Sequence, residues 1–213
     1  MYNRIGKRIL DCIIGVISLP FLFVIIVIMA PIIYLNDKGP IFYNALRLGK
    51  DGKPFKMFKF RRVNAPDIRN EDGSTYNGED DPRVTRVGKF MRKTSIDELP
   101  QFLNVFLGDM SLIGPRPDPV DDMNVYTEHQ KKKLAVRPGI TGYNQAYYRN
   151  SVEQNEKFEN DVYYAENISF KLDIKIFFKT ITTIFSRDNV YNDVSELNSE
   201  AKRRVEAMKA GRK

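Results

Sequence analysis

Two adjacent carboxylates, Asp97 and Glu98, are the residues in this sequence best suited to chemistry. They lie in the run Ser-Ile-Asp-Glu-Leu-Pro-Gln, and apolar residues follow at positions 99, 102, 103, 106 and 107. That spacing predicts a helix with one buried apolar stripe, which ends at Gly108. A carboxylate at the start of a helix is stabilised by the helix dipole and stays ionised at neutral pH. Such a carboxylate can be a nucleophile or a metal ligand, although helix capping alone would also explain both acids.

The position of Pro100 decides where this helix is expected to begin. A capping box from Ser95 to Glu98 would make Pro100 an interior residue, where it removes an intrahelical hydrogen bond. A start with Asp97 as the N-cap puts Pro100 in the first turn, where the missing N–H costs nothing. We therefore expect Asp97 at the N-terminus of the helix, with Arg92 shortly before it.

Basic residues at four positions could bind an anion beside these acids. Arg92 precedes them, Arg116 lies between two prolines in a Gly-Pro-Arg-Pro turn, and Arg137 begins an Arg-Pro-Gly-Ile-Thr-Gly segment. Rigid turns hold a guanidinium at low entropic cost, and glycines let the backbone approach an anion closely. Lys59 interrupts a strand face that begins apolar, and it could meet a phosphate. The simpler alternatives are a solvent-facing arginine and a lysine that reaches water along an apolar surface.

The composition limits the kinds of site that this chain can form. With one cysteine, Cys12, an intramolecular disulfide is impossible, and a reducing compartment fits best. The lone histidine, His129, excludes zinc sites with several His or Cys ligands, and its Glu-His-Gln-Lys-Lys-Lys run is typical of a solvated helix face. The net charge of +7 favours an anionic partner. Basic residues follow the apolar segment and recur near the C-terminus, which favours a membrane surface over nucleic acid.

Residues 9–35 form an almost entirely apolar segment. It is too long for the apolar core of a signal peptide, and a continuous helix of this length could cross a bilayer. Basic residues flank both ends, within residues 4–8 and within residues 38–62, and the positive-inside preference puts both flanks in the cytoplasm. A helix broken near Pro20, which enters and leaves the same leaflet, satisfies both flanks, and Ser18 could bond one backbone group freed at the break. A single-span anchor is the simpler alternative.

The rest of the chain is predicted to form a small cytoplasmic domain. Residues 41–48 and 54–61 read as strands of a β-hairpin, joined across a short loop that contains Asp-Gly. Residues 64–82 are polar and predict a mobile loop. From Phe170 onward, apolar residues trace one helical stripe opposite lysines, so this helix either covers the domain core or lies in the membrane interface.

These elements together predict an α+β fold that is mainly helical. We expect a membrane-embedded re-entrant helix-break-helix over residues 1–37 and a cytoplasmic catalytic domain over residues 38–191, with a β-hairpin and amphipathic interfacial helices. A charged tail over residues 192–213 is expected to fray or to contact lipid peripherally.

A series of motifs along nearly the whole chain resembles the small, monotopic phosphoglycosyl transferases, which are bacterial sugar transferases. Each motif is weak alone, but their combination in this order is specific. They are Lys-Arg-x-x-Asp at 7–11, Gly-Pro-Ile-Phe at 39–42, Arg-Leu-Gly at 47–49, Phe-Lys-Met-Phe-Lys-Phe at 55–60, Asp-Pro-Arg-Val-Thr at 81–85, Ser-Ile-Asp-Glu-Leu-Pro-Gln at 95–101, Gly-Asp-Met-Ser at 108–111, Gly-Pro-Arg-Pro at 114–117 and Arg-Pro-Gly-Ile-Thr-Gly at 137–142.

The resemblance implies transfer of a phosphosugar from a UDP-sugar to polyprenol (undecaprenyl) phosphate, with release of UMP. In that family the Asp of the Asp-Glu pair, here Asp97, is the nucleophile and forms a covalent phosphosugar intermediate, while the Glu, here Glu98, helps to hold Mg²⁺. Lys59, Arg92 and Arg116 match basic positions that would contact the diphosphate or nucleotide. A cation is also expected physically, because two carboxylates would otherwise repel a diphosphate.

The resemblance also implies a place in the cell. The reaction would initiate a cell-surface glycoconjugate pathway at the cytoplasmic face of the bacterial inner membrane, among membrane lipids and possible downstream glycosyltransferases. The family usually breaks its re-entrant helix at an adjacent Ser-Pro pair, whereas this chain has Ser18-Leu19-Pro20. Two rival functions are a membrane-anchored UDP-sugar-binding scaffold without turnover and a metal-dependent phosphohydrolase. Nothing in the sequence identifies the sugar.

Overall fold

The computed structural model describes residues 2–63, 81, 83–149 and 151–186, and within them the fold is mostly helical with two small two-stranded sheets. The coarse prediction of a mainly helical α+β fold is confirmed. The predicted loop at 64–82, apart from Asp81 itself, and the tail at 192–213 lie outside the described residues. The helices and strands are α1 (Lys7–Asn36), β1 (Ala45–Leu48), β2 (Pro54–Met57), α2 (Arg86–Thr94), α3 (Gln101–Leu107), β3 (Ser111–Ile113), β4 (Gly139–Thr141), α4 (Tyr143–Tyr147), α5 (Gln154–Glu166) and α6 (Phe170–Ser186).

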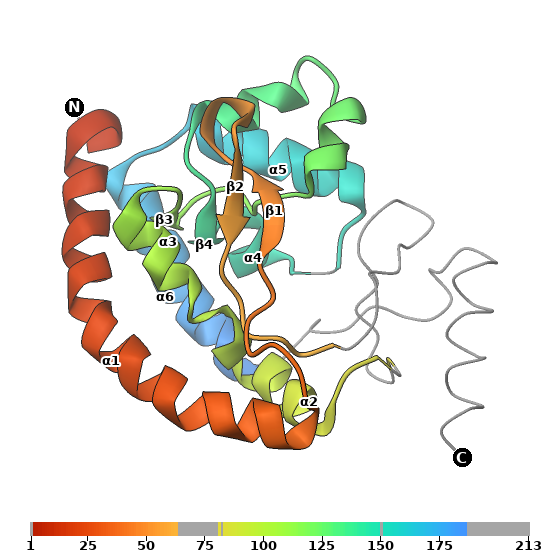
Figure 1. The fold of residues 1–213 in the computed structure, drawn as a ribbon. Helices are drawn as coiled ribbons and strands as arrows, with labels where there is room; N and C mark the ends of the chain where they lie inside the picture. The colour runs from red at the N-terminus through yellow and green to blue at the C-terminus, as the bar shows by residue number, and fades with distance from the viewer. Residues whose placement is uncertain (1, 64–80, 82, 150, 187–213) are drawn as a thin grey trace.

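The apolar N-terminal segment is one helix of 30 residues, α1, and it curves along one side of the molecule (Figure 1). Two separate helices with a break near Pro20 were predicted, and this detail is corrected because α1 continues through Pro20. Pro20 has no N–H to donate, so one intrahelical bond is missing there. Ser18 makes a local backbone bond, with Oγ donating to the Gly15 carbonyl at 2.7 Å. By length and composition, α1 is the one helix among the described residues that could cross a membrane.

The first turns of α1 are tied to the folded domain by polar contacts. Lys7 Nζ lies 2.6 Å from Asp173 Oδ2 on α6. Arg8 donates to carbonyls near the end of α3. Asp11 is buried and accepts a 2.9 Å bond from the Leu112 amide on β3. A buried carboxylate needs such partners, so the N-terminal end of the apolar helix has a defined place on the domain.

The last turns of α1 contact the same domain. Met29 packs in a core cluster with Phe60 and Met91, all three of which are buried. Just past the helix end, Arg61 Nη1 lies 2.8 Å from Asp37 Oδ2. Most side chains between these two ends are apolar and exposed on the protein surface. Both ends of this helix are therefore held by one folded unit.

The predicted β-hairpin is confirmed, with strands shorter than expected. β1 and β2 pair antiparallel, and Leu48 faces Pro54 next to the loop. Asp51 in this loop has φ 58°, a left-handed conformation that Asp adopts more readily than most residues. An isolated bridge between Phe42 and Phe60 continues the pairing beyond the strands. The chain that leaves β2 then runs directly toward the two acids.

The parallel strands β3 and β4 bring the Gly-Pro-Arg-Pro segment at 114–117 next to the Arg-Pro-Gly-Ile-Thr-Gly segment at 137–142. Ser111 faces Gly139, and Gly114 donates its amide to the Thr141 carbonyl at 2.8 Å. A Cβ on Gly139 would lie 2.1 Å from the Gly114 nitrogen, so this close approach requires glycine at position 139. The turn that carries Arg116 is therefore fixed against the strand that leads to α4.

The apolar stripe predicted to be buried on α3 is only partly covered, and this prediction is wrong. Phe106 and Leu107 are 40% and 57% exposed, whereas Asn104 is fully buried. Asn104 accepts a bond from the Phe58 amide and donates to the Lys56 carbonyl, which fastens α3 to the hairpin. Periodicity identifies an apolar helix face but cannot distinguish a core neighbour from lipid. Helices α1 and α3 pack together (Figure 1), and large apolar side chains remain exposed on both.

Helix α6 adds to this exposed apolar surface. Ile176 and Asp173 are buried, while Phe170 and Phe178 are more than half exposed. The predicted amphipathic character is confirmed, and one face of α6 does cover the core through Ile176. Exposed apolar surface of this extent on α1, α3 and α6 is typical of a membrane or partner interaction site.

Candidate active site

The two acids lie in a short 3-10 turn, Ile96–Glu98, between α2 and α3. Ser95 ends α2 in a left-handed conformation, φ 58°, and the turn starts from it. Helix α3 begins only at Gln101, directly after Pro100, so the expectation that Asp97 is its N-cap is wrong. The Phe60 amide donates to the Asp97 carbonyl at 3.0 Å, which fixes the turn against the chain that leaves β2. Asp97 is 2% exposed.

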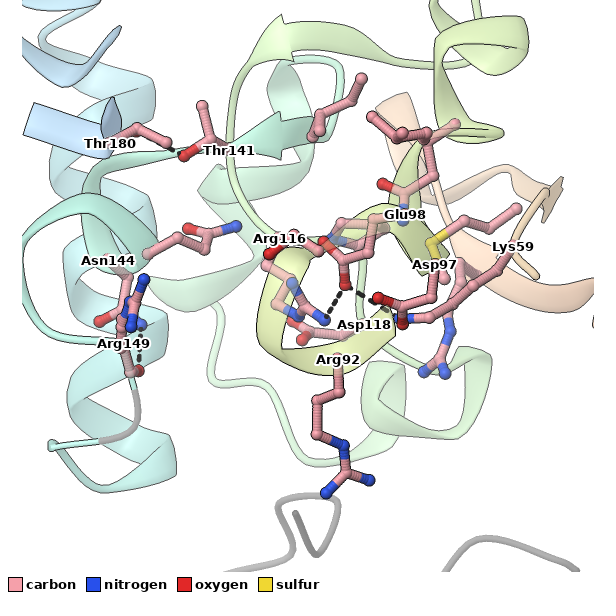
Figure 2. A pocket seen from close by; sticks show the side chains of 18 of the residues that line it. Lys59, Arg92, Asp97, Glu98, Arg116, Asp118, Thr141, Asn144, Arg149 and Thr180 are labelled. Carbon is pink, nitrogen blue, oxygen red and sulfur yellow. Dashed lines mark hydrogen bonds and ion pairs between the residues drawn. The ribbon is translucent and has the colours of Figure 1, made fainter. Parts of the chain in front are cut away.

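Lys59 lies between the two carboxylates. Its Nζ is 3.0 Å from Asp97 Oδ2 and 2.9 Å from Glu98 Oε1. Arg116 Nη2 donates to the same Glu98 oxygen at 3.1 Å, and Figure 2 shows both cations directed at the acid pair. The structure thus brings together four of the predicted site residues from three separate segments, and it places cations where a phosphate would need them.

Arg62 is a site residue that sequence reasoning missed. Its Nη1 lies 3.5 Å from Asp97 Oδ2. Strict strand alternation would put Arg62 and Lys59 on opposite faces, but β2 ends at Met57, so alternation no longer applies. No hydrogen bond to Asp97 Oδ2 forms within the described residues, despite the two nearby cations. This oxygen is therefore oriented by charge and retains a lone pair for a further partner.

The surrounding charges hold Glu98 in its ionised form. Burial by itself raises the pKa of the Glu98 carboxyl, but the charges of Lys59 and Arg116 outweigh burial and hold that pKa well below its usual range. The Glu98 carboxylate in turn raises the pKa of the Arg116 guanidinium. The Glu98 carboxylate and the Arg116 guanidinium therefore stay charged over the whole physiological pH range.

Two of the predicted basic residues have other partners. Arg92 lines the cleft beside the acids, but its Nη2 lies 3.7 Å from Asp81 Oδ2, and it points away from Glu98 in Figure 2. Asp81 also accepts a 2.7 Å bond from Arg83, so this is a buried polar cluster. Arg137 does not line the cleft; its Nε donates to the Gly108 carbonyl at 2.8 Å and caps α3. The Arg137 guanidinium thus stabilises the C-terminal end of that helix, and its substrate contact stays a prediction.

A buried cation supports the turn that carries Arg116. Lys133 is 2% exposed, and its Nζ lies 2.6 Å from both Asp118 and Asp161. Asp118 follows Pro117 in the Arg116 turn and also accepts a 2.7 Å bond from the Tyr126 hydroxyl. Burial raises the pKa of Asp161 to about 6, although Lys133 opposes this shift. The run of lysines around 131–133 predicted only a solvated face, and no sequence signal distinguished Lys133.

His129 is half exposed and lies 3.3 Å from Glu159, away from the acids.

The acids open into a cleft of about 590 Å³. One end carries the acids and their cations. Apolar side chains of α3 and α6, among them Phe102, Phe177 and Ile181, line another part. The far end carries Thr141, Asn144, Arg149 and Thr180, which Figure 2 labels on the side away from the acids. The cleft therefore offers charged, apolar and polar surfaces in one continuous space.

The acid pair fits a magnesium ion only in part. Two carboxylates are the hard oxygen ligands that Mg²⁺ prefers, yet the described residues contain no group of three possible His, Cys, Asp or Glu ligands. Mg²⁺ is commonly held by one or two carboxylates together with substrate phosphates. Glu98 suits that arrangement, in which a diphosphate supplies the remaining oxygens. Magnesium thus stays a prediction.

Comparison with known proteins gives one consistent result. The family described as bacterial sugar transferase matches residues 2–187. The uncharacterized sugar transferase EpsL of Bacillus subtilis is 40% identical over 86% of this chain and 89% of its own length. An Aeromonas hydrophila relative named UDP-N-acetylgalactosamine-undecaprenyl-phosphate N-acetylgalactosaminephosphotransferase is 39% identical over 84% of this chain and 44% of its own. The UDP-glucose:undecaprenyl-phosphate glucose-1-phosphate transferase of Escherichia coli is 37% identical over 89% and 42%. The chain thus spans most of the first relative and less than half of the other two.

Proposed function

Because the chain belongs to the bacterial sugar transferase family, we propose that it transfers a phosphosugar from a UDP-sugar to undecaprenyl phosphate and releases UMP. Relatives named for this reaction use different sugars, N-acetylgalactosamine and glucose, with the same lipid phosphate. The observation that carries the proposal is the buried Asp97 beside Lys59, Glu98 and Arg116 in one cleft. Phosphoryl transfer depends on alignment and charge neutralisation, which such a cluster supplies.

In the proposed mechanism Asp97 is the nucleophile. One of its carboxylate oxygens attacks the phosphorus that carries the sugar, and the bond from that phosphorus to the bridging oxygen of the diphosphate breaks. UMP leaves with the bridging oxygen and its electron pair. A phosphate oxygen of undecaprenyl phosphate then attacks the same phosphorus, which releases Asp97 and forms the diphosphate-linked lipid. The oxygen Oδ2, which has no hydrogen bond among the described residues, suits the attacking role.

The neighbours of Asp97 would stabilise the charge that develops during both steps. Lys59 and Arg62 lie beside the nucleophile, and Arg116 reaches Glu98 from the opposite segment. On donor binding, these cations can exchange contacts with the carboxylates for contacts with phosphate oxygens. Glu98 is ionised and is the residue that would hold Mg²⁺, which supplies charge neutralisation at the diphosphate when bound.

The attachment of α1 supports a location on one face of the membrane. Its first turns bind α6 through Lys7, and its last turns pack against Phe60 in the same domain. A helix whose two ends are held by one folded unit cannot easily place those ends on opposite sides of a bilayer. We infer a re-entrant, monotopic arrangement at the cytoplasmic face of the bacterial inner membrane, where a donor and downstream glycosyltransferases are accessible. The apolar part of the cleft between α3 and α6 gives the acceptor's hydrocarbon chain a route to Asp97.

An assay of UMP release tests the proposal. Purified full-length protein with a panel of UDP-sugars, Mg²⁺ and undecaprenyl phosphate is expected to release UMP and to form a sugar diphospholipid with at least one donor. UMP release that continues at the same rate without acceptor would favour the phosphohydrolase function. Binding of UDP-sugars without UMP release under any condition would favour the scaffold function.

A further inference from the structure

Gln145 has a buried side-chain amide whose hydrogen-bonding capacity is unused. It lies on α4, just after β4, and it lines the cleft that also contains Asp97. Both Nε2 and Oε1 are shielded from solvent, and neither has a hydrogen-bond partner among the described residues. A buried amide without partners is unfavourable for folding, so a ligand that pairs with it would remove that penalty.

The neighbouring polar side chains differ from Gln145 because they bond within the protein. Asn160 donates to Asn144 Oδ1 at 3.2 Å, and Asn144 donates to the Arg149 carbonyl at 3.4 Å. The hydroxyls of Thr141 and Thr180 lie 2.8 Å apart. Figure 2 labels Thr141, Asn144, Arg149 and Thr180 on the side of the cleft away from the acid pair. These polar side chains thus have hydrogen-bond partners within the protein, whereas the Gln145 amide has none among the described residues.

The chemistry of the Gln145 side chain indicates which part of a donor it can bind, while the cations Arg149 and Lys157 also line the cleft. The diphosphate needs the cations Lys59, Arg62 and Arg116 at the acid pair. Gln145 presents a neutral carboxamide, which offers one donor and one acceptor side by side in a plane. The imide edge of uracil carries an N3–H beside a carbonyl, so the two edges can form a pair of hydrogen bonds. A carboxamide can present either orientation by rotation about its last torsion, and both orientations retain one donor and one acceptor.

We propose that the Gln145 carboxamide recognises the uracil base of the donor through its imide edge. This inference rests on the proposed function, because it takes the donor to be a UDP-sugar. Uridine is the part that the donors named for the relatives have in common, while their sugars differ. Gln145 is therefore a specificity residue for the nucleotide, and it leaves the choice of sugar to other residues.

The first test changes only the ligand and keeps the protein intact. Binding of UDP and of 3-methyl-UDP, whose N3 carries a methyl group in place of the proton, is measured by calorimetry on the full-length protein in detergent with Mg²⁺. UDP is expected to bind at least about tenfold more tightly, since a bidentate amide–base pair gives discrimination of this size. Equal affinities would overturn the proposal without any mutation.

The second test combines the ligand change with Gln145→Ala. The variant is expected to bind UDP about tenfold more weakly than the wild type and to lose its preference for UDP over 3-methyl-UDP. Gln154→Ala is the matched control, because Gln154 lines the same cleft but already interacts within the protein; it should keep the wild-type preference. An equal loss of affinity for both nucleotides in Gln145→Ala would mean a structural role and would overturn the proposal.

Further outcomes separate this inference from the proposed function. Unchanged UDP binding in Gln145→Ala, with altered KM values among UDP-sugars, would show that the amide contacts the sugar and would overturn the proposal. In that case, UMP release by the wild type would leave the transferase function intact. If the wild type neither binds UDP nor releases UMP from any UDP-sugar, both the uracil site and the proposed function are rejected.

Discussion

Lys59 Nζ lies 2.9 Å from Glu98 Oε1, and this buried cation is the immediate neighbour of both carboxylates in the cleft. The contact joins the chain that leaves the hairpin to the turn between α2 and α3. It also places a positive charge beside two adjacent acids where the protein excludes most water.

Replacement of Lys59 should therefore affect both folding and turnover. Lys59→Met leaves Asp97 and Glu98 without their closest cation, and loss of one partner of a buried ion pair typically costs about 3–5 kcal/mol. Turnover should fall by about 100-fold or more, as for other electrostatic groups at a reacting centre. Thermal unfolding in detergent and UMP release measure the two effects. Lys56→Met, on the exposed face of β2, is the control, and equal behaviour of the two variants would contradict the role of Lys59.

Glu98→Gln should change the response to magnesium. The amide keeps the shape of the side chain but removes a charged oxygen ligand, so we expect a lower maximal rate and a higher Mg²⁺ concentration for half-maximal activity. A titration of UMP release against Mg²⁺ measures both. Because surrounding charges keep the pKa of Glu98 well below its usual range, the difference from wild type should not vary between pH 6 and 8. A metal titration identical to that of the wild type would remove Glu98 from the metal site.

The Asp161 carboxyl should make stability depend on pH in a defined direction. Burial raises its pKa from 3.8 to about 6, so the folded state binds this proton more tightly than the unfolded state does. The contribution of Asp161 to the free energy of unfolding is therefore fully present below about pH 4 and is lost as the pH rises through about 6. The whole contribution is roughly 3 kcal/mol.

Asp161→Asn, which mimics the protonated acid, should remove this dependence. The free energy of unfolding is measured for the wild type and the variant from pH 4.5 to 7.5. The difference between the two proteins should change by roughly 2 kcal/mol in favour of the variant as the pH rises. A constant difference over that range would show that Asp161 does not titrate there.

The attachment of α1 at both ends predicts the same membrane side for the N-terminus and the hairpin loop. Epitope tags at residue 1 and in the loop at residues 50–52 should both resist protease in intact spheroplasts and become sensitive after permeabilisation. A tagged periplasmic protein serves as the accessibility control. Cleavage of the N-terminal tag alone in intact spheroplasts would show that α1 spans the bilayer and would contradict the monotopic arrangement.

Local sequence chemistry was enough to predict the hairpin, the apolar helix and the acid pair. The Asp-Gly loop, the long apolar run and the adjacent carboxylates are signals within a few residues of the chain. The prediction that Lys59 belongs to the site needed the resemblance to a family as well, because a lysine within a strand has several common roles, and its contact with Glu98 was not predicted.

Other features depended on contacts that no local pattern contains. The stripe on α3 has the spacing of a buried face, but Phe106 and Leu107 are exposed on the protein surface. Exposed apolar residues of this kind are expected where a protein contacts lipid or a partner. Lys133 lies in a run of lysines and is buried only because two distant acids, Asp118 and Asp161, surround it. Arg137 has the motif of an anion contact, yet its Nε donates to the carbonyl of Gly108, just after α3.

The central claim is that Asp97 carries the phosphosugar between donor and acceptor. Wild-type protein and Asp97→Asn are incubated with Mg²⁺ and a panel of UDP-sugars without acceptor, and intact-mass spectrometry then detects any adduct. A phosphosugar adduct is expected on the wild type alone, and undecaprenyl phosphate should remove it. The amide of Asp97→Asn keeps the side-chain shape but is not a nucleophile. An adduct on Asp97→Asn, or turnover by the wild type without an adduct under any condition, would contradict the role assigned to Asp97.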